Sequence, residues 1–141
     1  LIPALGYLMP VLILKKRNCR TLRKHKESDL IRDCIEYLRF SGYIPIRVNS
    51  GLVVLRDGSR TRVVRLAEKG TPDIVACGPD GRFIAIECKN GSSKLTEHQK
   101  VFLDKIKKNN GIAVVINCLD DLIEVVNYRY GGKIPGNRKA S

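Results

Sequence analysis

The sequence contains no tryptophan, one methionine and two histidines, and no two of its cysteines stand in a CxxC pair. His25 and His98 have no cysteine at ligand spacing, so the sequence predicts no zinc site. It also has no apolar run of the roughly 20 residues that a membrane-spanning helix needs. The apolar residues 1–14 are broken by Pro3 and Pro10. The positive charges of Lys15, Lys16 and Arg17 come after this apolar run. In a signal peptide the positive charges come before the apolar run. We therefore expect no membrane-spanning segment and no signal peptide, and in the main interpretation no membrane partner.

Five cysteines form an odd set without the regular spacing of a disulfide framework. Three of them fall in predicted strands or at strand ends. This pattern is typical of reduced thiols in an intracellular protein, and we expect the chain to be intracellular.

Acidic residues are missing from both ends of the chain, and the net charge of +12 reflects this. Residues 15–26 contain seven lysines and arginines and no acid, and four more follow Glu124 without one. The middle of the chain is nearly neutral. Basic ends of this kind favour a polyanion, most often nucleic acid. The alternatives are solvated tails that aid solubility, or contact with an anionic membrane surface.

The 141 residues are enough for one domain with a buried core. Apolar periodicity and turn signals predict an α/β domain with a mixed central sheet flanked by helices. We expect residues 1–26 to be a poorly ordered extension, 27–128 to be the domain, and 129–141 to be a disordered basic tail. The expected helices are 28–40 (begun by Ser28 or one residue earlier by Glu27), 97–109 and 119–128, and the expected strands are 43–48, 52–56, 61–66, 74–77, 83–86 and 112–117.

A predicted β-hairpin places two carboxylates together. Its strands flank the turn-forming GPDGR sequence, with Asp73 entering the first strand and Glu87 leaving the second. If the strands pair antiparallel about Pro79–Gly81, Asp73 and Glu87 lie opposite each other. Like charges in that arrangement repel. A divalent cation between them would remove the repulsion, so the hairpin predicts a metal site.

Pro72-Asp73 followed by Glu87-Cys88-Lys89 resembles the PD-(D/E)xK nuclease signature. The surrounding GTPD, IECK, LTEHQ and NNG sequences resemble the VRR-NUC family, over about residues 27–121. The resemblance implies a restriction-endonuclease-like core of αβββαβα order. It also implies a metal-dependent DNA endonuclease that acts on branched, flapped or four-way junction DNA. Members of the family occur alone in phages, where they pair as homodimers, and as terminal domains of DNA repair enzymes. The resemblance thus implies a possible homodimer, and a host cytoplasm if the chain is encoded by a phage. No small-molecule cofactor is expected.

The chemistry of phosphodiester hydrolysis suits these three side chains. Asp73 and Glu87 are hard oxygen donors for Mg²⁺, with Mn²⁺ as a substitute. The resemblance implies that the backbone carbonyl of Cys88 completes the coordination. Lys89 shares a strand face with Glu87 and could orient the attacking water or stabilise the phosphate. The structural alternatives are a turn or cap role for Asp73 and a surface ion pair for Glu87 and Lys89.

Supporting residues are assigned by position. Glu27 is a further candidate metal ligand, and the alternative is an acid at the helix start that is favoured by the helix dipole. Glu36, farther along the helix, could take the place of Glu27 as a ligand. Gln99 is expected beside the site with Pro72, although a capping box explains Gln99 equally well. His98 is expected to be a surface residue rather than a general base. Candidate contacts to the nucleic acid are Arg47, Asn49, Ser50, Lys94 and Lys100.

Two other functions fit the same sequence. The chain could be a non-catalytic nucleic-acid-binding protein that retains the nuclease fold, but Asp73, Glu87 and Lys89 are all present. RNA is the other alternative, because net charge does not distinguish RNA from DNA.

Overall fold

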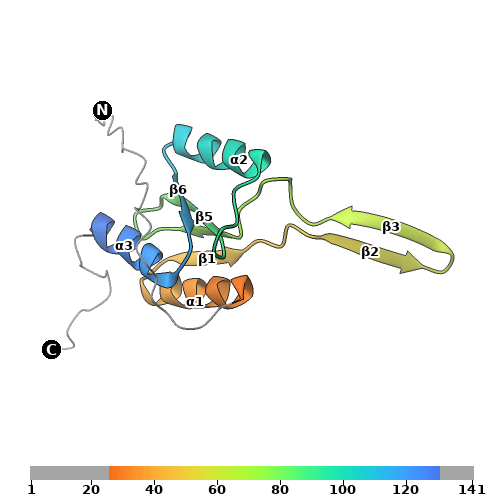
Figure 1. Ribbon diagram of the computed structural model, residues 1–141, viewed down its shortest axis with the longest axis horizontal. Helices are drawn as coiled ribbons and strands as arrows, with labels where there is room; N and C mark the ends of the chain where they lie inside the picture. The colour runs from red at the N-terminus through yellow and green to blue at the C-terminus, as the bar shows by residue number, and fades with distance from the viewer. Residues whose placement is uncertain (1–25, 131–141) are drawn as a thin grey trace.

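The structure is a computed structural model that describes residues 26–130. The predicted extension 1–26, except its last residue, and all but the start of the tail 129–141 lie outside the described residues. The described chain forms three helices and six strands (Figure 1), in the order α1 (Glu27–Phe40), β1 (Ile44–Arg47), β2 (Leu52–Asp57), β3 (Arg60–Arg65), β4 (Ile74–Cys77), β5 (Phe83–Cys88), α2 (Glu97–Lys108), β6 (Ile112–Ile116) and α3 (Leu119–Tyr130).

Four strands form a mixed sheet in the order β1-β4-β5-β6. The β1–β4 and β4–β5 pairs are antiparallel, and the β5–β6 pair is parallel. A parallel pair needs a crossover connection, and α2 is that crossover. Helices α1 and α3 contact each other on one side of the sheet, and α2 packs against β6. Figure 1 shows α2 on the opposite side of the sheet from α1. This architecture confirms the predicted α/β fold with a mixed central sheet.

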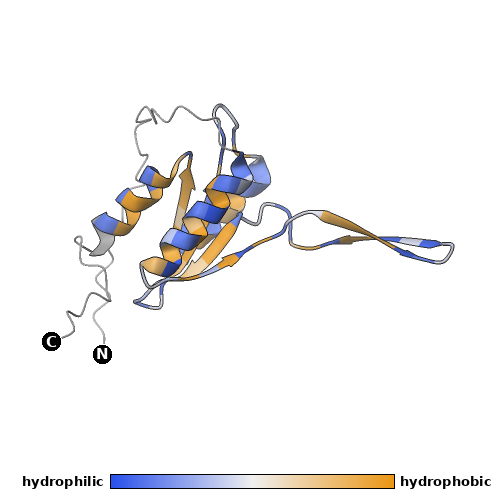
Figure 2. Cartoon of the chain, turned by 90° about the horizontal axis from the view of Figure 1, so that it is seen from below, coloured by the Kyte–Doolittle hydropathy of each residue, from blue (hydrophilic) through white to orange (hydrophobic). Residues whose placement is uncertain are grey.

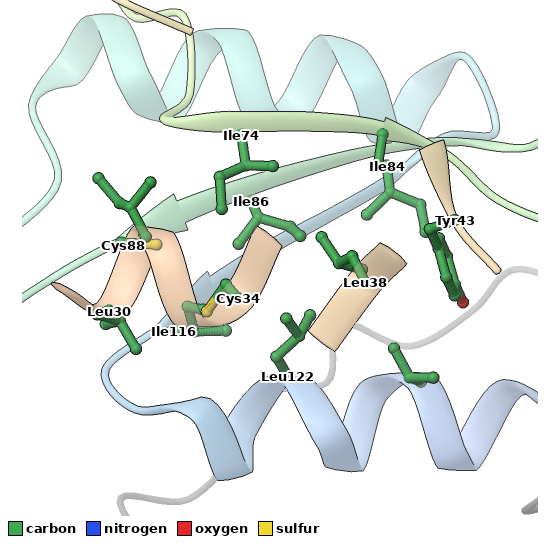
Figure 3. Packing of buried hydrophobic residues seen from close by; sticks show 13 residues of the cluster. Leu30, Cys34, Leu38, Tyr43, Ile74, Ile84, Ile86, Cys88, Ile116 and Leu122 are labelled. Atoms are coloured by element: carbon green, nitrogen blue, oxygen red, sulfur yellow. The ribbon is translucent and has the colours of Figure 1, made fainter. Parts of the chain in front are cut away.

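The main core lies between the sheet and the pair α1 and α3 (Figure 3). The buried face of α1 repeats at helical spacing through Leu30, Cys34 and Leu38. Ile74 and Ile86 meet it from the two central strands, where each is fully buried. Burying one such aliphatic side chain contributes about 1.5–3 kcal/mol. The core therefore fixes which sheet face points toward α1. The opposite face, on which Ala85 is also buried, is the side where α2 lies (Figure 1).

Strands β2 and β3 form a separate two-stranded sheet, which we call the arm. The arm projects away from the other elements in both views (Figures 1 and 2). The sequence predicts a two-residue hairpin turn at Asp57-Gly58. The hairpin is confirmed, but Asp57 pairs with Arg60, so the two loop residues are Gly58 and Ser59, and Gly58 adopts a positive φ of 57°. When the arm is counted as an insertion, the remaining elements follow the expected αβββαβα order.

Most predicted boundaries agree with the structure to within two residues. Helix α1 begins at Glu27, the earlier of the two predicted starts, and its N-cap is Lys26, which makes no side-chain cap hydrogen bond. The expectation of reduced, buried cysteines holds only in part. Cys34 and Cys88 are buried free thiols and Cys77 is an exposed one, whereas Cys118 is disulfide-bonded. Among the described residues, no helix has the length and apolar character needed to cross a membrane.

Candidate active site

The β4–β5 hairpin has the register that the sequence predicts. Ile74 pairs with Ile86 and Cys77 pairs with Phe83, so one more step along the strands sets Asp73 opposite Glu87. Alternation along each strand directs both carboxylates to the face opposite Ile74 and Ile86. The two acids therefore share the sheet face that lies away from α1.

The carboxylate of Asp73 is held by the backbone of the neighbouring strand. The Cys88 N–H donates a 2.8 Å hydrogen bond to Asp73 Oδ2. On its other side, the Asp73 carbonyl accepts a 2.8 Å hydrogen bond from the Val48 N–H, just past β1. Asp73 is thus positioned from both adjacent strands, which excludes a free turn residue at this position.

Pro72 leaves the Cys88 carbonyl without a hydrogen-bond donor from the hairpin ladder. The Gly78 N–H donates to the Arg82 carbonyl, which makes 78 and 82 a hydrogen-bonded pair of the hairpin. Such pairs alternate along an antiparallel ladder, so Pro72 and Cys88 occupy the corresponding positions at the other end. Proline has no N–H to donate. The ladder therefore supplies no donor from Pro72 to the Cys88 carbonyl, which is the carbonyl predicted as a metal ligand.

Glu87 is the most deeply buried acid of the site, with 2% of its surface exposed. Its Oε1 accepts hydrogen bonds from Lys89 Nζ, at 2.8 Å, and from Gln99 Nε2. Its Oε2 is buried and has no hydrogen-bond partner among the described residues. A buried carboxylate oxygen without a donor costs free energy. The site therefore has an oxygen that requires a cation or another ligand.

The surroundings of Glu87 change its proton affinity. Burial raises the pKa of the Glu87 carboxyl above its usual value, the Lys89 hydrogen bond opposes this, and the charge of Asp73 adds to the increase. The charge of Glu27 raises this pKa as well. A cation bound between these acids would favour the ionised form of Glu87.

Gln99 performs both of the roles predicted for it as alternatives. Its Oε1 accepts the Thr96 N–H at 2.9 Å, and its own N–H donates to Thr96 Oγ1 at 3.3 Å, which completes a capping box at the start of α2. Because Oε1 is used in the cap, Nε2 points to Glu87. The helix start thereby orients a donor toward the site.

Gly70 brings α2 close to the loop that precedes Asp73. Its φ is 85°, and a Cβ at this position would lie 2.3 Å from the backbone oxygen of His98. Only glycine tolerates both conditions without strain. The sequence reasoning assigned Gly70 no role. The one signal in the sequence for this role is the position of Gly70, at the end of a loop and two residues before the Pro-Asp pair, where a glycine can indicate a close approach of two backbone segments.

Cys88 divides its functions between backbone and side chain. Its side chain is fully buried in the core, as strand alternation predicts. A hydrogen bond with Cys34, followed by burial, raises the pKa of the Cys88 thiol. The sulfur is therefore a structural group, and only the backbone of Cys88 faces the site.

The other predicted acids and His98 stand outside this cluster. Glu27 is exposed at the first position of α1 and Glu36 is exposed farther along it. His98 is exposed, as expected for a surface residue. Within residues 26–130, no three histidine, cysteine or acidic side chains are grouped so as to hold a metal ion. The acids that could share one ion are therefore Asp73 and Glu87.

The predicted nucleic-acid contacts are all exposed, and they lie in three places. Arg47 is the last residue of β1, beside the site. It pairs with Ile74, so its side chain lies on the face of the sheet that does not carry Asp73. Asn49 and Ser50 lie in the connection from β1 to the arm. Lys94 lies in the loop before α2, and Lys100 is paired with Glu97 at 2.6 Å.

Comparison with known proteins identifies the family. The model of the VRR-NUC domain matches residues 26–119. A solved structure titled "VRR_NUC domain" is similar over 75% of this chain and 100% of its own, with a TM-score of 0.53 and 16% sequence identity, which supports the restriction-endonuclease-like fold. No curated protein matches the chain. Because the family model covers well over half of the sequence, including Asp73, Glu87, Lys89 and Gln99, the chain belongs to the VRR-NUC family.

Proposed function

We propose that the chain is a Mg²⁺-dependent DNA endonuclease that hydrolyses phosphodiester bonds and selects DNA by structure, such as branches, flaps or four-way junctions. A nuclease function follows from membership of the VRR-NUC family. The observation that supports a metal-dependent reaction is the Oε2 of Glu87, which is buried without a hydrogen-bond partner among the described residues, on the strand opposite Asp73.

The residues present fit Mg²⁺, with Mn²⁺ as a substitute. Mg²⁺ usually binds one or two carboxylates and keeps several waters, so the lack of a third acidic ligand is compatible with it. Asp73, Glu87 and the Cys88 carbonyl would hold the ion, and Glu27 would add negative charge nearby. Bound there, the ion would supply a Lewis acid for the phosphoryl oxygens and lower the pKa of a bound water.

The chain's own groups position the other participants. Lys89 is 13% exposed and forms an ion pair with the buried Glu87. From that place its ammonium can contact a phosphate oxygen or a water and stabilise negative charge as it develops. Gln99 fixes the orientation of Glu87. The Asp73 carboxylate is directed by the hydrogen bond that its Oδ2 accepts from the Cys88 N–H.

The proposal also covers the cellular location, the substrate, the oligomeric state and the residues that contact the DNA. We place the enzyme inside the cell, in a host cytoplasm if it is encoded by a phage, with DNA as its substrate and a homodimer as its working state. Asn49, Ser50 and Lys94 are proposed as phosphate contacts, because they are exposed near the strand and helix ends that form the site. Arg47 is proposed as a contact at the sheet edge, since it is exposed but lies on the other sheet face from Asp73. Lys100 is the weakest of these contacts, since Glu97 already pairs with it.

The direct test incubates the purified chain with labelled linear, flapped and four-way DNA, and with RNA, in Mg²⁺, Mn²⁺ or EDTA. We expect metal-dependent cutting of branched DNA that Asp73→Asn and Glu87→Gln each slow by about 10²–10³-fold or more. Undiminished cutting in EDTA or in these variants contradicts the proposal. Binding without cutting in either metal indicates instead a non-catalytic nucleic-acid-binding protein.

A further inference from the structure

The arm contains all of the excess positive charge of the described domain. Residues 26–130 contain 17 lysines and arginines and 14 acids. Four of those basic residues lie in the arm with a single acid, Asp57, so the rest of the described chain has 13 charges of each sign. The basic residues of the arm are Arg56, Arg60, Arg62 and Arg65.

These arginines are exposed and available. All four are exposed, and none of them forms an ion pair within the described part of the chain. Guanidinium groups form bidentate hydrogen bonds with phosphate and are over-represented where phosphate is recognised. The charge of the arm therefore suits a polyanion.

The arginines lie on both faces of the arm. Arg56 pairs with Thr61 and Arg65 with Leu52, while Arg62 pairs with Leu55 and Arg60 with Asp57. Because side chains alternate between faces, Arg56 and Arg65 lie on one face and Arg60 and Arg62 on the other. Charge on two faces suits a ligand that has phosphates on two sides, as the groove of a duplex does.

Apolar side chains separate the arginines. Leu52, Val54, Leu55 and Val63 are each more than half exposed. The methylene stems of Arg62 and Arg65 can lie along their cross-strand neighbours Leu55 and Leu52, which leaves the charged ends outermost. Small apolar side chains can also contact thymine methyl groups in the major groove. A solvated hairpin would have polar residues in these positions.

The arm begins at the edge of the sheet where the candidate active site lies. The Val48 N–H bonds to the Asp73 carbonyl just before the chain enters the arm, and the Leu66 N–H bonds to the Gly51 carbonyl where the arm ends. Six residues in each strand give the arm a reach of about 20 Å from this edge. A duplex that presents a phosphate to Asp73 and Glu87 would therefore be within reach of the arm.

We propose that the arm is a DNA-binding ribbon that enters the major groove of the duplex next to the bond that is cut. A two-stranded ribbon fits the major groove, which is about 12 Å wide. The inference rests on DNA as the substrate of the proposed function, but it does not depend on cleavage. The charge of the sequence predicts the main DNA contact at the basic ends of the chain, whereas this proposal assigns it to the arm beside the site.

The test compares two triple variants of the full chain with the same loss of charge. The arm variant is Arg60→Gln, Arg62→Gln and Arg65→Gln. The control is Lys105→Gln, Lys107→Gln and Lys108→Gln, at the end of α2 remote from Gln99. Binding to a labelled linear duplex is measured by fluorescence anisotropy in EDTA at several salt concentrations. Circular dichroism checks that both variants fold.

Each phosphate contact contributes about 0.9 to the slope of log affinity against log salt. In the arm variant we expect the slope to become less steep by about 2–3 and the affinity to fall by roughly tenfold or more. In the control we expect the slope to change by less than about one. We also expect methyl green, a major-groove ligand, to compete with the protein, whereas the minor-groove ligand netropsin does not. An unchanged slope in the arm variant, or equal changes in both variants, overturns the proposal.

Two outcomes separate this inference from its alternatives. If wild type cuts DNA and the arm variant binds with an unchanged salt slope, the proposed nuclease activity is supported and DNA binding by the arm is contradicted. If the salt slope of the arm variant is less steep and wild type never cuts DNA, DNA binding by the arm is supported and the nuclease activity is contradicted. A second variant, Val54→Asp with Val63→Asp, tests pairing of the arm with a second copy of the chain. Light scattering that shows a dimer lost in this variant, with the salt slope intact, overturns the ribbon.

Discussion

Gln99 connects the start of α2 to Glu87: its Oε1 accepts from the Thr96 N–H, and its Nε2 donates to Glu87 Oε1. One side chain thus stabilises a helix end and orients an acid of the site. The two functions can be separated because they use different atoms of the amide. Glutamate can replace the first function, since it also forms a capping box, but it cannot donate to Glu87.

The first prediction uses this separation. Gln99→Glu keeps the cap but sets a second negative charge against the buried Glu87, so we expect cleavage to fall strongly and thermal stability at neutral pH to fall although the cap is retained. Gln99→Ala loses both functions, and we expect a loss of about 1 kcal/mol of stability together with the loss of activity. Cleavage rates and urea unfolding measure the two effects. Full activity in Gln99→Glu would show that the contact to Glu87 has no part in the reaction.

The second prediction concerns the charge of Asp73. Asp73→Asn retains an oxygen that can accept the Cys88 N–H, so we expect a folded protein whose cleavage rate is lower by about 10²–10³-fold, the usual loss for one stabilising group. The control is Asp80→Asn, which makes the same charge change at the turn of the hairpin. Mg²⁺ binding by calorimetry should weaken in the first variant alone. Equal cleavage by the two variants contradicts the assignment.

The third prediction follows from the missing N–H of Pro72. Pro72→Ala restores a donor opposite the Cys88 carbonyl, which then competes with the metal for that oxygen. One neutral hydrogen bond contributes about 0.5–1.5 kcal/mol, so we expect the Mg²⁺ concentration for half-maximal rate to rise about two- to tenfold. Pro79→Ala, in the exposed turn, controls for the general effect of losing a proline. An unchanged metal requirement in Pro72→Ala would remove the carbonyl from the ligand set.

The fourth prediction concerns pH in the absence of metal. Burial raises the pKa of Glu87 in the folded protein above its unfolded value of 4.5, so the folded state binds this proton more tightly than the unfolded state does. The stability that the proton contributes is complete below pH 4.5 and is lost as pH rises through the folded-state pKa. In EDTA, wild type should therefore lose stability relative to Glu87→Gln over that interval. Thermal unfolding at a series of pH values measures the difference, and parallel curves contradict it.

The fifth prediction concerns Gly70. Gly70→Ala combines a positive φ with a clash against the His98 backbone, so we expect a loss of more than about 1 kcal/mol and a displaced α2. The matched control is Gly81→Ala, where φ is also positive (78°) but nothing lies within 4 Å of the added Cβ. Urea unfolding should show the larger loss in Gly70→Ala. Equal losses would mean that backbone strain alone, without the contact to α2, explains the effect.

The fold and the pairing of Asp73 with Glu87 were predictable because they depend on local patterns. Helical spacing in α1 and the GPDGR turn are short-range signals, and the turn alone sets the register that brings Asp73 to Glu87. The contact between Gln99 and Glu87 depends on how α2 docks on the sheet, which no local pattern specifies. The sequence therefore left its two roles as alternatives.

The function proposed for the arm was not predicted from the sequence, for a related reason. Its hairpin was predicted, but its separation from the main sheet was not, because hydrophobic alternation looks alike in a sheet strand and in a free ribbon. The reasoning from charge emphasised the ends of the chain, where basic residues are adjacent in sequence. In the arm, the arginines become neighbours only when the two strands pair.

The turn between β4 and β5 lies at the opposite end of the hairpin from the two carboxylates, yet it determines where they point. The Gly78 N–H bonds to the Arg82 carbonyl, and the Gly81 N–H bonds to the Gly78 carbonyl, which fixes the count of residues between the strands. A shift of one residue in pairing reverses the face of every side chain on a strand. Inserting a single residue into this turn would thus separate the acids while every residue of the candidate site stayed unchanged, so the site depends on the length of this turn as well as on its own side chains.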